Sequence, residues 1–220
     1  MPEMMSLMGD RPLYVALGDS LTVGIGATFF QPNFVKLYQH SIEYYFRQPV
    51  ERLSFAKNGA TSEQILEQLL HPETTHAVAN ASFITLTAGG NDMLHASRKW
   101  LKTGNQAELS ESIQSCVATI EEILWTIFEI HASNPQKFCV RVLNLYNPMP
   151  QIRETYFWLE QYNKQLASLE RAPDVKIADV YHAFLGNEPM LLTLDHTHPN
   201  PLGYRIMADT AVHLGFEPVS

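Results

Sequence analysis

The sequence has 220 residues, of which 45% are hydrophobic, and a formal net charge of −8 from 15 basic and 23 acidic side chains. This length and composition predict a single globular domain over residues 1–220 with a sizeable apolar core. A negative chain without a long run of Lys or Arg argues against binding to nucleic acid or to an anionic membrane surface, and no stretch approaches the roughly 18 to 20 apolar residues that span a bilayer.

The start of the chain, MPEMMSLMGDRP, has no basic region and too short an apolar core for a secretory signal peptide. We therefore expect residues 1–12 to be an N-terminal extension and the protein to be cytoplasmic, with a mature secreted form as the alternative. The two cysteines, Cys116 and Cys139, are too few for a disulfide framework. Both fall in apolar patterns, which predicts buried core thiols.

Short apolar runs alternate with amphipathic stretches along the whole chain. Five of the apolar runs are predicted to be strands, and several of them are apolar almost throughout, as expected for strands that are buried on both faces of a sheet. In chain order, the predicted strands are Tyr14–Leu17, Val50–Phe55, Phe83–Ala88, Cys139–Tyr146 and Val175–Val180.

Five helices are predicted between and after these strands. The second has Thr61 and Gln64 at the spacing of a capping box, and the last has Asn200 and Pro201 at the positions of an N-cap and a first helical residue. The long third helix has apolar residues at three- and four-residue spacing, which gives it one apolar face. The helices are Phe34–Phe46, a helix from Thr61, a helix from Ser110 to near Asn134-Pro135, roughly Gln151–Glu170 and about Pro201–Leu214.

This alternation predicts a parallel sheet with helices on both faces. In such a fold, ligands bind beyond the carboxyl ends of the strands. Four polar segments meet this condition, because three follow the first three strands and one precedes the last helix. They are Gly18-Asp19-Ser20, Asn58-Gly59-Ala60, Gly89-Gly90-Asn91-Asp92 and Asp195-His196-Thr197-His198. We expect them to converge on one edge of the sheet.

The chemistry of these segments is complementary. A serine hydroxyl such as that of Ser20 is a weak nucleophile and needs a base beside it, and His198 has a suitable side chain. A carboxylate, here Asp195, orients the imidazole and stabilises its charged form. The backbone N–H groups of Ser20 and Gly59 and the side-chain amide of Asn91 are candidate donors for an oxyanion hole.

With these four segments, the sequence resembles the SGNH hydrolases, the GDSL family of esterases and lipases. Gly18-Asp19-Ser20-Leu21, Gly59, Gly90-Asn91-Asp92 and Asp195-x-x-His198 stand in the family's order and reach from near residue 13 to residue 204. The resemblance implies a flavodoxin-like, three-layer α/β/α fold with a five-stranded parallel sheet, ester hydrolysis, and no metal. The start LGDSLTxGxGA is most similar to the bacterial lysophospholipase and arylesterase branch.

Several of these residues also have plainer interpretations. Ser20 alone is explained equally well as a turn residue or a helix cap. Only the presence of the other three polar segments favours a catalytic role for it. We interpret Asp19 and Asp92 as acids that hydrogen-bond nearby backbone rather than as acid catalysts. His196 is the second histidine of its segment, but His198 has the Asp-x-x-His spacing of the family.

Asp195, His196 and His198 could also be read as metal ligands. Only three ligands lie within four residues, so we predict no metal and no other cofactor. Residues 18–26 lack the Gly-Lys-Ser/Thr ending of a phosphate-binding loop.

The other seven histidines, His131 among them, fall in helix or loop patterns that are typical of surface or hydrogen-bonded side chains.

Large apolar residues follow several of the predicted strands and indicate an acyl-binding pocket; ordinary packing of long loops is the alternative. The substrate-binding candidates are Met93, Leu94, Met149 and Leu191, with Phe184, Met190 and Leu192 nearby. The predicted function is a serine hydrolase of small carboxylic esters with short or medium acyl chains or of lysophospholipid type. The alternatives are a carbohydrate O-deacetylase, a thioesterase or a non-catalytic α/β binding module. Oligomeric state is left open.

Overall fold

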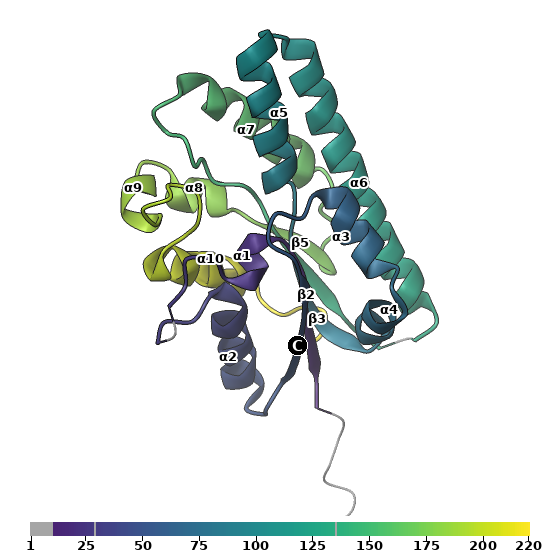
Figure 1. Ribbon diagram of the computed structural model, residues 1–220. Coiled ribbons are helices and arrows are strands. Elements are labelled where there is room, and N and C mark those ends of the chain that lie inside the picture. Colours follow the sequence, from purple (N-terminus) through teal and green to yellow (C-terminus); the bar gives the residue numbers. More distant parts are fainter. Residues whose placement is uncertain (1–10, 29, 135) are drawn as a thin grey trace, which may run out of the picture.

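The computed structural model describes residues 11–28, 30–134 and 136–220, so most of the predicted extension and Pro135 lie outside the described residues. Five strands form one all-parallel sheet in the order β2-β1-β3-β4-β5 (Figure 1). This confirms the predicted sheet, and its order places a topological switch point between β1 and β3, where ligands bind in folds of this kind. The strands are β1 Leu13–Gly18, β2 Glu51–Ala56, β3 Ala81–Thr87, β4 Cys139–Leu143 and β5 Val175–Ala178.

Helices cover both faces of the sheet, which confirms the predicted three-layer fold (Figure 1). One apolar core lies between the sheet and α3, α4, α6 and α7, and the other lies between the sheet and α2, α8 and α10. The helices are α1 Ser20–Val23, α2 Phe34–Phe46, α3 Ser62–Leu69, α4 Pro72–Ala79, α5 Gly90–Thr103, α6 Gln106–Ala132, α7 Arg153–Ala167, α8 Val180–Phe184, α9 Glu188–Leu191 and α10 Pro201–His213.

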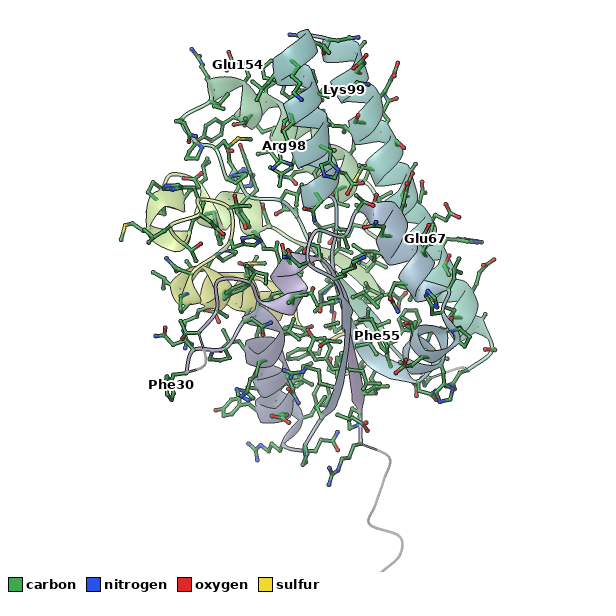
Figure 2. The ribbon with its side chains drawn as sticks, viewed as in Figure 1. Phe30, Phe55, Glu67, Arg98, Lys99 and Glu154 are labelled. Atoms are coloured by element: carbon green, nitrogen blue, oxygen red, sulfur yellow. The ribbon has the colours of Figure 1, made fainter. Side chains whose placement is uncertain are left out.

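The period of two along a strand explains how one strand serves both cores. In β1, Val15 and Leu17 belong to the first core, whereas Tyr14 and Ala16 belong to the second. The charged side chain of Glu67 on α3 is exposed and points away from the sheet (Figure 2). The inner strands are therefore buried on both faces, as their apolar sequences predict.

Both cysteines are free thiols, and each lies in one of the two cores, as predicted. Burial raises the pKa of the Cys116 thiol to about 12 and that of Cys139 to about 11. Thiols with these pKa values stay protonated near neutral pH and are poor nucleophiles.

Two helix starts are built as their sequences predict. Thr61 Oγ1 accepts from the N–H of Gln64 at 3.4 Å, and Gln64 Oε1 accepts from the N–H of Thr61 at 3.3 Å, so both halves of the capping box before α3 are present. Asn200 Oδ1 accepts from the N–H groups of Leu202 and Gly203 and caps α10. The second cap fixes where the chain enters α10, directly after the predicted catalytic histidine.

Other boundaries differ from the prediction. The long helix α6 begins at Gln106 instead of after Ser110, because Asn105 caps it through bonds to the N–H groups of residues 107 and 108. β4 ends at Leu143 rather than Tyr146, because the N–H and C=O of Leu145 bond to the side chain of Asn163 instead of to a strand. Helices α1, α4, α5, α8 and α9 were not predicted.

His131 is the exception to the interpretation of the seven remaining histidines, because the other six are exposed, as expected. It is buried on α6, its ring stacks on Phe138 with centroids 3.8 Å apart, and neither ring nitrogen has a partner among the described residues. Burial lowers the pKa of His131 to about 4. The ring is therefore a neutral core side chain rather than a surface or hydrogen-bonded one.

Candidate active site

The site lies at the carboxyl ends of β1 and β3, at the switch point of the sheet. Ser20 follows β1 and is the first residue of α1, while Asn91 lies in the first turn of α5, which follows β3. His198 comes from residues 192–200 between α9 and α10, here called the His198 loop. The structure thus brings all four polar segments to one edge of the sheet, as predicted. The fourth, Asn58-Gly59-Ala60, is joined to the third by the bond from Asn91 Nδ2 to the C=O of Ala60 at 2.8 Å.

Asp19 shapes the turn that presents Ser20. Its Oδ1 accepts from the N–H of Leu21 at 3.0 Å and from Thr87 Oγ1 at 2.8 Å, which caps α1 and ties it to β3. Burial raises the pKa of the Asp19 carboxyl to about 6, against the effect of these bonds. Ser20 itself is largely buried, and its hydroxyl faces His198.

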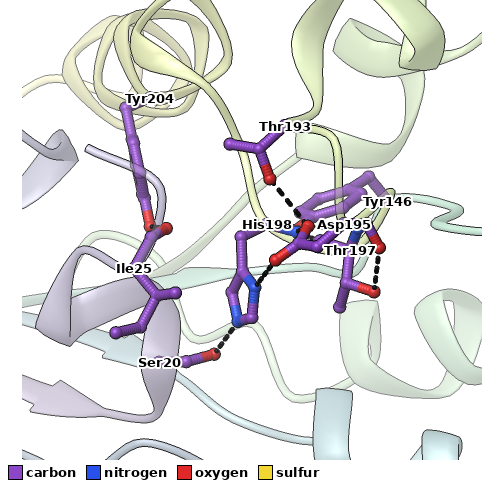
Figure 3. A network of polar contacts seen from close by, with 8 residues as sticks. All are labelled: Ser20, Ile25, Tyr146, Thr193, Asp195, Thr197, His198 and Tyr204. Atoms are coloured by element: carbon purple, nitrogen blue, oxygen red, sulfur yellow. Dashed lines mark hydrogen bonds and ion pairs between the residues drawn. The ribbon is translucent and has the colours of Figure 1, made fainter. Parts of the chain in front are cut away.

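Ser20, His198 and Asp195 are in hydrogen-bond contact in a row (Figure 3). Ser20 Oγ lies 3.0 Å from His198 Nε2, and His198 Nδ1 lies 2.6 Å from Asp195 Oδ2. These distances fit a nucleophile, a base and a carboxylate that orients the base. His196 takes no part in this row, so the structure favours His198 of the two histidines.

Asp195 is held by its own loop. Its Oδ1 accepts from Thr193 Oγ1 at 2.7 Å and from the N–H groups of Thr197 and His198 at 2.8 and 2.9 Å. Partial burial raises the pKa of the Asp195 carboxyl, but the hydrogen bonds from His198, Thr193 and Thr197 outweigh it and hold the pKa well below its ordinary value. The carboxylate therefore stays charged beside the imidazole.

Asn91 and Asp92 join α5 to the loop after β2. Asn91 Nδ2 donates to the C=O of Ala60 at 2.8 Å, which uses one of its two amide hydrogens. Asp92 accepts from the N–H of Ser62 at 3.0 Å and from its hydroxyl at 2.7 Å, so it acts as a structural acid, as interpreted from the sequence. Gly59, at φ +79°, is exposed, and its N–H has no acceptor among the described residues.

A cavity of about 360 Å³ opens beside Ser20 and extends between α5, α6 and α7. Asn91 and the triad line one end of it, and most of the remaining wall is apolar. Met93, Leu94 and Met149 line it, as the sequence predicts, although the first two lie on α5 and not on a loop. Residues that line it without having been predicted include Arg98, Trp100, Leu101, Leu109, Tyr146, Trp158 and Leu159.

Leu191 does not line this cavity, contrary to the prediction. The segment before the His198 loop folds as α9, and Leu191 is buried in the core against α10, where its C=O accepts from the N–H of Asn200 at 2.8 Å. Phe184 and Leu192 are buried in the same core, while Met190 is 69% exposed. Phe184, Leu191 and Leu192 therefore pack in the core instead of lining the cavity.

Among the described residues, no group of three or more His, Cys, Asp or Glu side chains is arranged to hold a metal ion. Within the same part of the chain, the longest apolar helical stretches fall short of what a membrane crossing needs.

The chain is similar to known proteins over most of its length. Residues 16–206 match the GDSL-like lipase/acylhydrolase family. The chain is 36% identical over 203 residues to the spore germination lipase LipC of Bacillus licheniformis. The alignment covers 92% of this chain and 96% of that lipase.

Solved structures show the same relationship. The crystal structure of the lipase Lip_vut3 from a goat rumen metagenome aligns with a TM-score of 0.92 and 35% identity, over 96% of this chain and 100% of that one. The acetylxylan esterase Axe2 from Geobacillus stearothermophilus shares the fold, with a TM-score of 0.66 and 16% identity over 96% of this chain and 98% of that one. The chain therefore belongs to the GDSL-like lipase/acylhydrolase family of ester hydrolases.

Proposed function

We propose that the protein hydrolyses carboxylic esters through an acyl-enzyme intermediate on Ser20. The observation that carries this proposal is the row of contacts from Ser20 Oγ to His198 Nε2 at 3.0 Å and from His198 Nδ1 to Asp195 Oδ2 at 2.6 Å. In the first step, His198 Nε2 takes the proton of Ser20 as its oxygen attacks the ester carbonyl carbon. His198 then gives this proton to the leaving alcohol oxygen as the ester C–O bond breaks.

In the second step, His198 takes a proton from water, whose oxygen attacks the acyl-enzyme. The bond from Ser20 Oγ to the acyl carbon breaks, and the proton returns to Ser20 as the carboxylic acid leaves. Asp195 keeps the imidazole oriented and stabilises its positive charge in both steps.

The negative charge on the carbonyl oxygen in each tetrahedral intermediate needs hydrogen-bond donors. We assign these donors to the N–H groups of Ser20 and Gly59 and to the side-chain amide of Asn91. Support comes from the N–H of Gly59, which has no acceptor among the described residues, and from Asn91, which keeps one amide hydrogen free of the bond to Ala60.

The apolar cavity is the proposed site of the acyl chain. An acetyl group would fill only a small part of a cavity of about 360 Å³, so the cavity favours short to medium alkyl chains, or the single chain of a lysophospholipid-type ester, over O-acetyl sugars. A thioester of the same acyl chain would bind the same cavity and meet the same triad.

We expect kcat/KM for p-nitrophenyl esters to rise with acyl length from two carbons until the cavity is filled, by at most about fourfold per methylene, because burying one CH₂ is worth about 0.8 kcal/mol. Replacing Leu94, which lines the cavity, by Trp should reduce the ratio of octanoate to acetate turnover about tenfold, because the larger side chain occupies the space of the chain.

Leu70→Trp is the matched control, because Leu70 is 62% exposed and does not line the cavity. This variant should keep the wild-type chain-length profile. A flat profile in the wild-type protein, or the same profile in the wild-type and Leu94→Trp proteins, would place the acyl chain elsewhere.

A further inference from the structure

Two buried tyrosine hydroxyls end on the two segments that carry the reacting side chains (Figure 3). Tyr146 OH donates to the C=O of Thr197 at 2.6 Å, and Tyr204 OH donates to the C=O of Ile25 at 2.7 Å. Thr197 belongs to the His198 loop, and Ile25 lies just after the α1 turn that begins with Ser20. Neither hydroxyl contacts Ser20 Oγ or His198 Nε2 directly.

Tyr146 holds the peptide unit that joins Thr197 to His198. The carbonyl oxygen of this unit accepts from Tyr146, and its N–H donates to Asp195 Oδ1 at 2.9 Å. The ring of Tyr146 stacks on Phe184, with centroids 4.6 Å apart and 21° between the planes. This packing fixes the position of the Tyr146 ring and so of its hydroxyl. Tyr146 thereby fixes the distance between the His198 loop and the segment after β4 at a peptide unit that also binds the catalytic carboxylate.

Tyr204 holds the segment that follows Ser20. The N–H of Ile25 donates to the C=O of Ser20 at 3.0 Å and closes the turn that bears the nucleophile. The C=O of the same residue, Ile25, accepts from Tyr204 OH. Tyr204 itself is fully buried on α10, the helix that begins directly after the His198 loop. Its hydroxyl therefore links the serine segment to the element that anchors the histidine.

Gly26 shows how closely the two segments are packed. It has a φ of +94°, and a Cβ at this position would lie 2.5 Å from the carbonyl oxygen of Pro199 and 3.4 Å from His198 Cβ. Only glycine fits this contact without displacing the His198 loop. The serine segment thus packs directly against the histidine segment, and one tyrosine hydroxyl is bonded to each.

We infer that Tyr146 and Tyr204 are positioning residues that set the distance and direction between Ser20 Oγ and His198 Nε2. This inference rests on the proposed function, because it takes these two groups as nucleophile and base. A misplacement of about 1 Å between reacting groups costs on the order of a hundredfold in rate. Losing either hydroxyl should therefore slow the chemical step while leaving substrate binding nearly unchanged.

The test compares Tyr146→Phe and Tyr204→Phe with Tyr14→Phe. The hydroxyl of Tyr14 is also buried and is hydrogen-bonded to Thr85 Oγ1 at 2.7 Å, but Tyr14 lies at the start of β1, about 13 Å of strand away from Gly18. With p-nitrophenyl acetate, we expect both test variants to lose about tenfold to a hundredfold in kcat with KM within about twofold. The control should keep kcat within about twofold, even where its melting temperature falls as much as theirs.

A second readout separates positioning from general destabilisation. In an Asp195→Asn background the imidazole is already in the wrong tautomer and no longer acts as the base, so adding Tyr146→Phe should lower kcat by no more than about threefold. Wild-type kcat in both Phe variants, an equal loss in Tyr14→Phe, or a full additional loss in the Asp195→Asn background would each overturn the inference. Failure of a fluorophosphonate probe to label Ser20 in the wild-type protein would contradict the proposed function itself.

Discussion

Replacing Ser20 by Ala is expected to reduce ester turnover by a factor on the order of 10⁴ or more, because the acyl-enzyme forms on the Ser20 hydroxyl. Ser20 Oγ is the only hydroxyl in contact with His198 Nε2 among the described residues. The residual rate would come from the hydrogen-bond donors and the binding cavity alone. The measurement is kcat/KM for p-nitrophenyl butyrate in purified protein.

The matched control for this variant is Ser54→Ala. Ser54 is an exposed serine on the edge strand β2, and its loss should leave turnover within about twofold of wild type. The melting temperature of the Ser20→Ala protein shows whether it is folded. A folded Ser20→Ala protein that turns over the ester at the wild-type rate would exclude Ser20 as the nucleophile.

Replacing Asp195 by Asn is expected to lower kcat by about 10³ to 10⁴, since an amide can turn the imidazole to the wrong tautomer and cannot stabilise its charge. The geometry of the site should change little, because the Asn side-chain oxygen can still accept from the N–H groups of Thr197 and His198. KM should therefore stay close to its wild-type value.

The chain carries its own control for this change. Asp179 caps α8 and binds His182 with the same three-residue spacing and the same 2.6 Å between Oδ2 and Nδ1, but no serine contacts that histidine among the described residues. Asp179→Asn removes an equivalent acid–histidine contact and should change kcat by no more than about twofold. Equal losses in both variants would mean that Asp195 acts through the stability of its loop alone.

Much of the candidate site can be predicted from the sequence, because each of its parts has a local pattern. Ser20 and Asn91 follow buried strands directly, and an open parallel sheet brings the ends of neighbouring strands together. Asp195 and His198 are three residues apart, so one loop places both. The same local rules predict the capping box at Thr61 and the start of α10.

The residues that line the cavity are harder to predict from the sequence. The segment of α5 carries charged residues among its apolar ones, so the face with Leu94 and Leu101 is visible only once a helix is assumed. Leu191 is apolar and close to Asp195 in sequence, yet its side chain packs into the core, because α9 turns it toward α10. Periodicity alone does not decide which side of a short helix faces a substrate.

The two tyrosine contacts could not be predicted by any local rule. Tyr146 and Thr197 are 51 residues apart, and Tyr204 and Ile25 are 179 residues apart. A hydrogen bond from a side chain to a distant backbone carbonyl requires no particular residue type at the accepting end. Only the folded arrangement of β4, α10 and the two loops reveals these contacts.

The central claim is that Ser20 is an activated nucleophile, and the most direct test is covalent labelling. Wild-type protein is treated with a fluorophosphonate, its intact mass is measured, and the modified peptide is sequenced by mass spectrometry. We predict a single adduct on Ser20, formed much more slowly in Asp195→Asn and absent in Ser20→Ala. An unlabelled protein that still hydrolyses esters, or an adduct on any other residue, would contradict the claim.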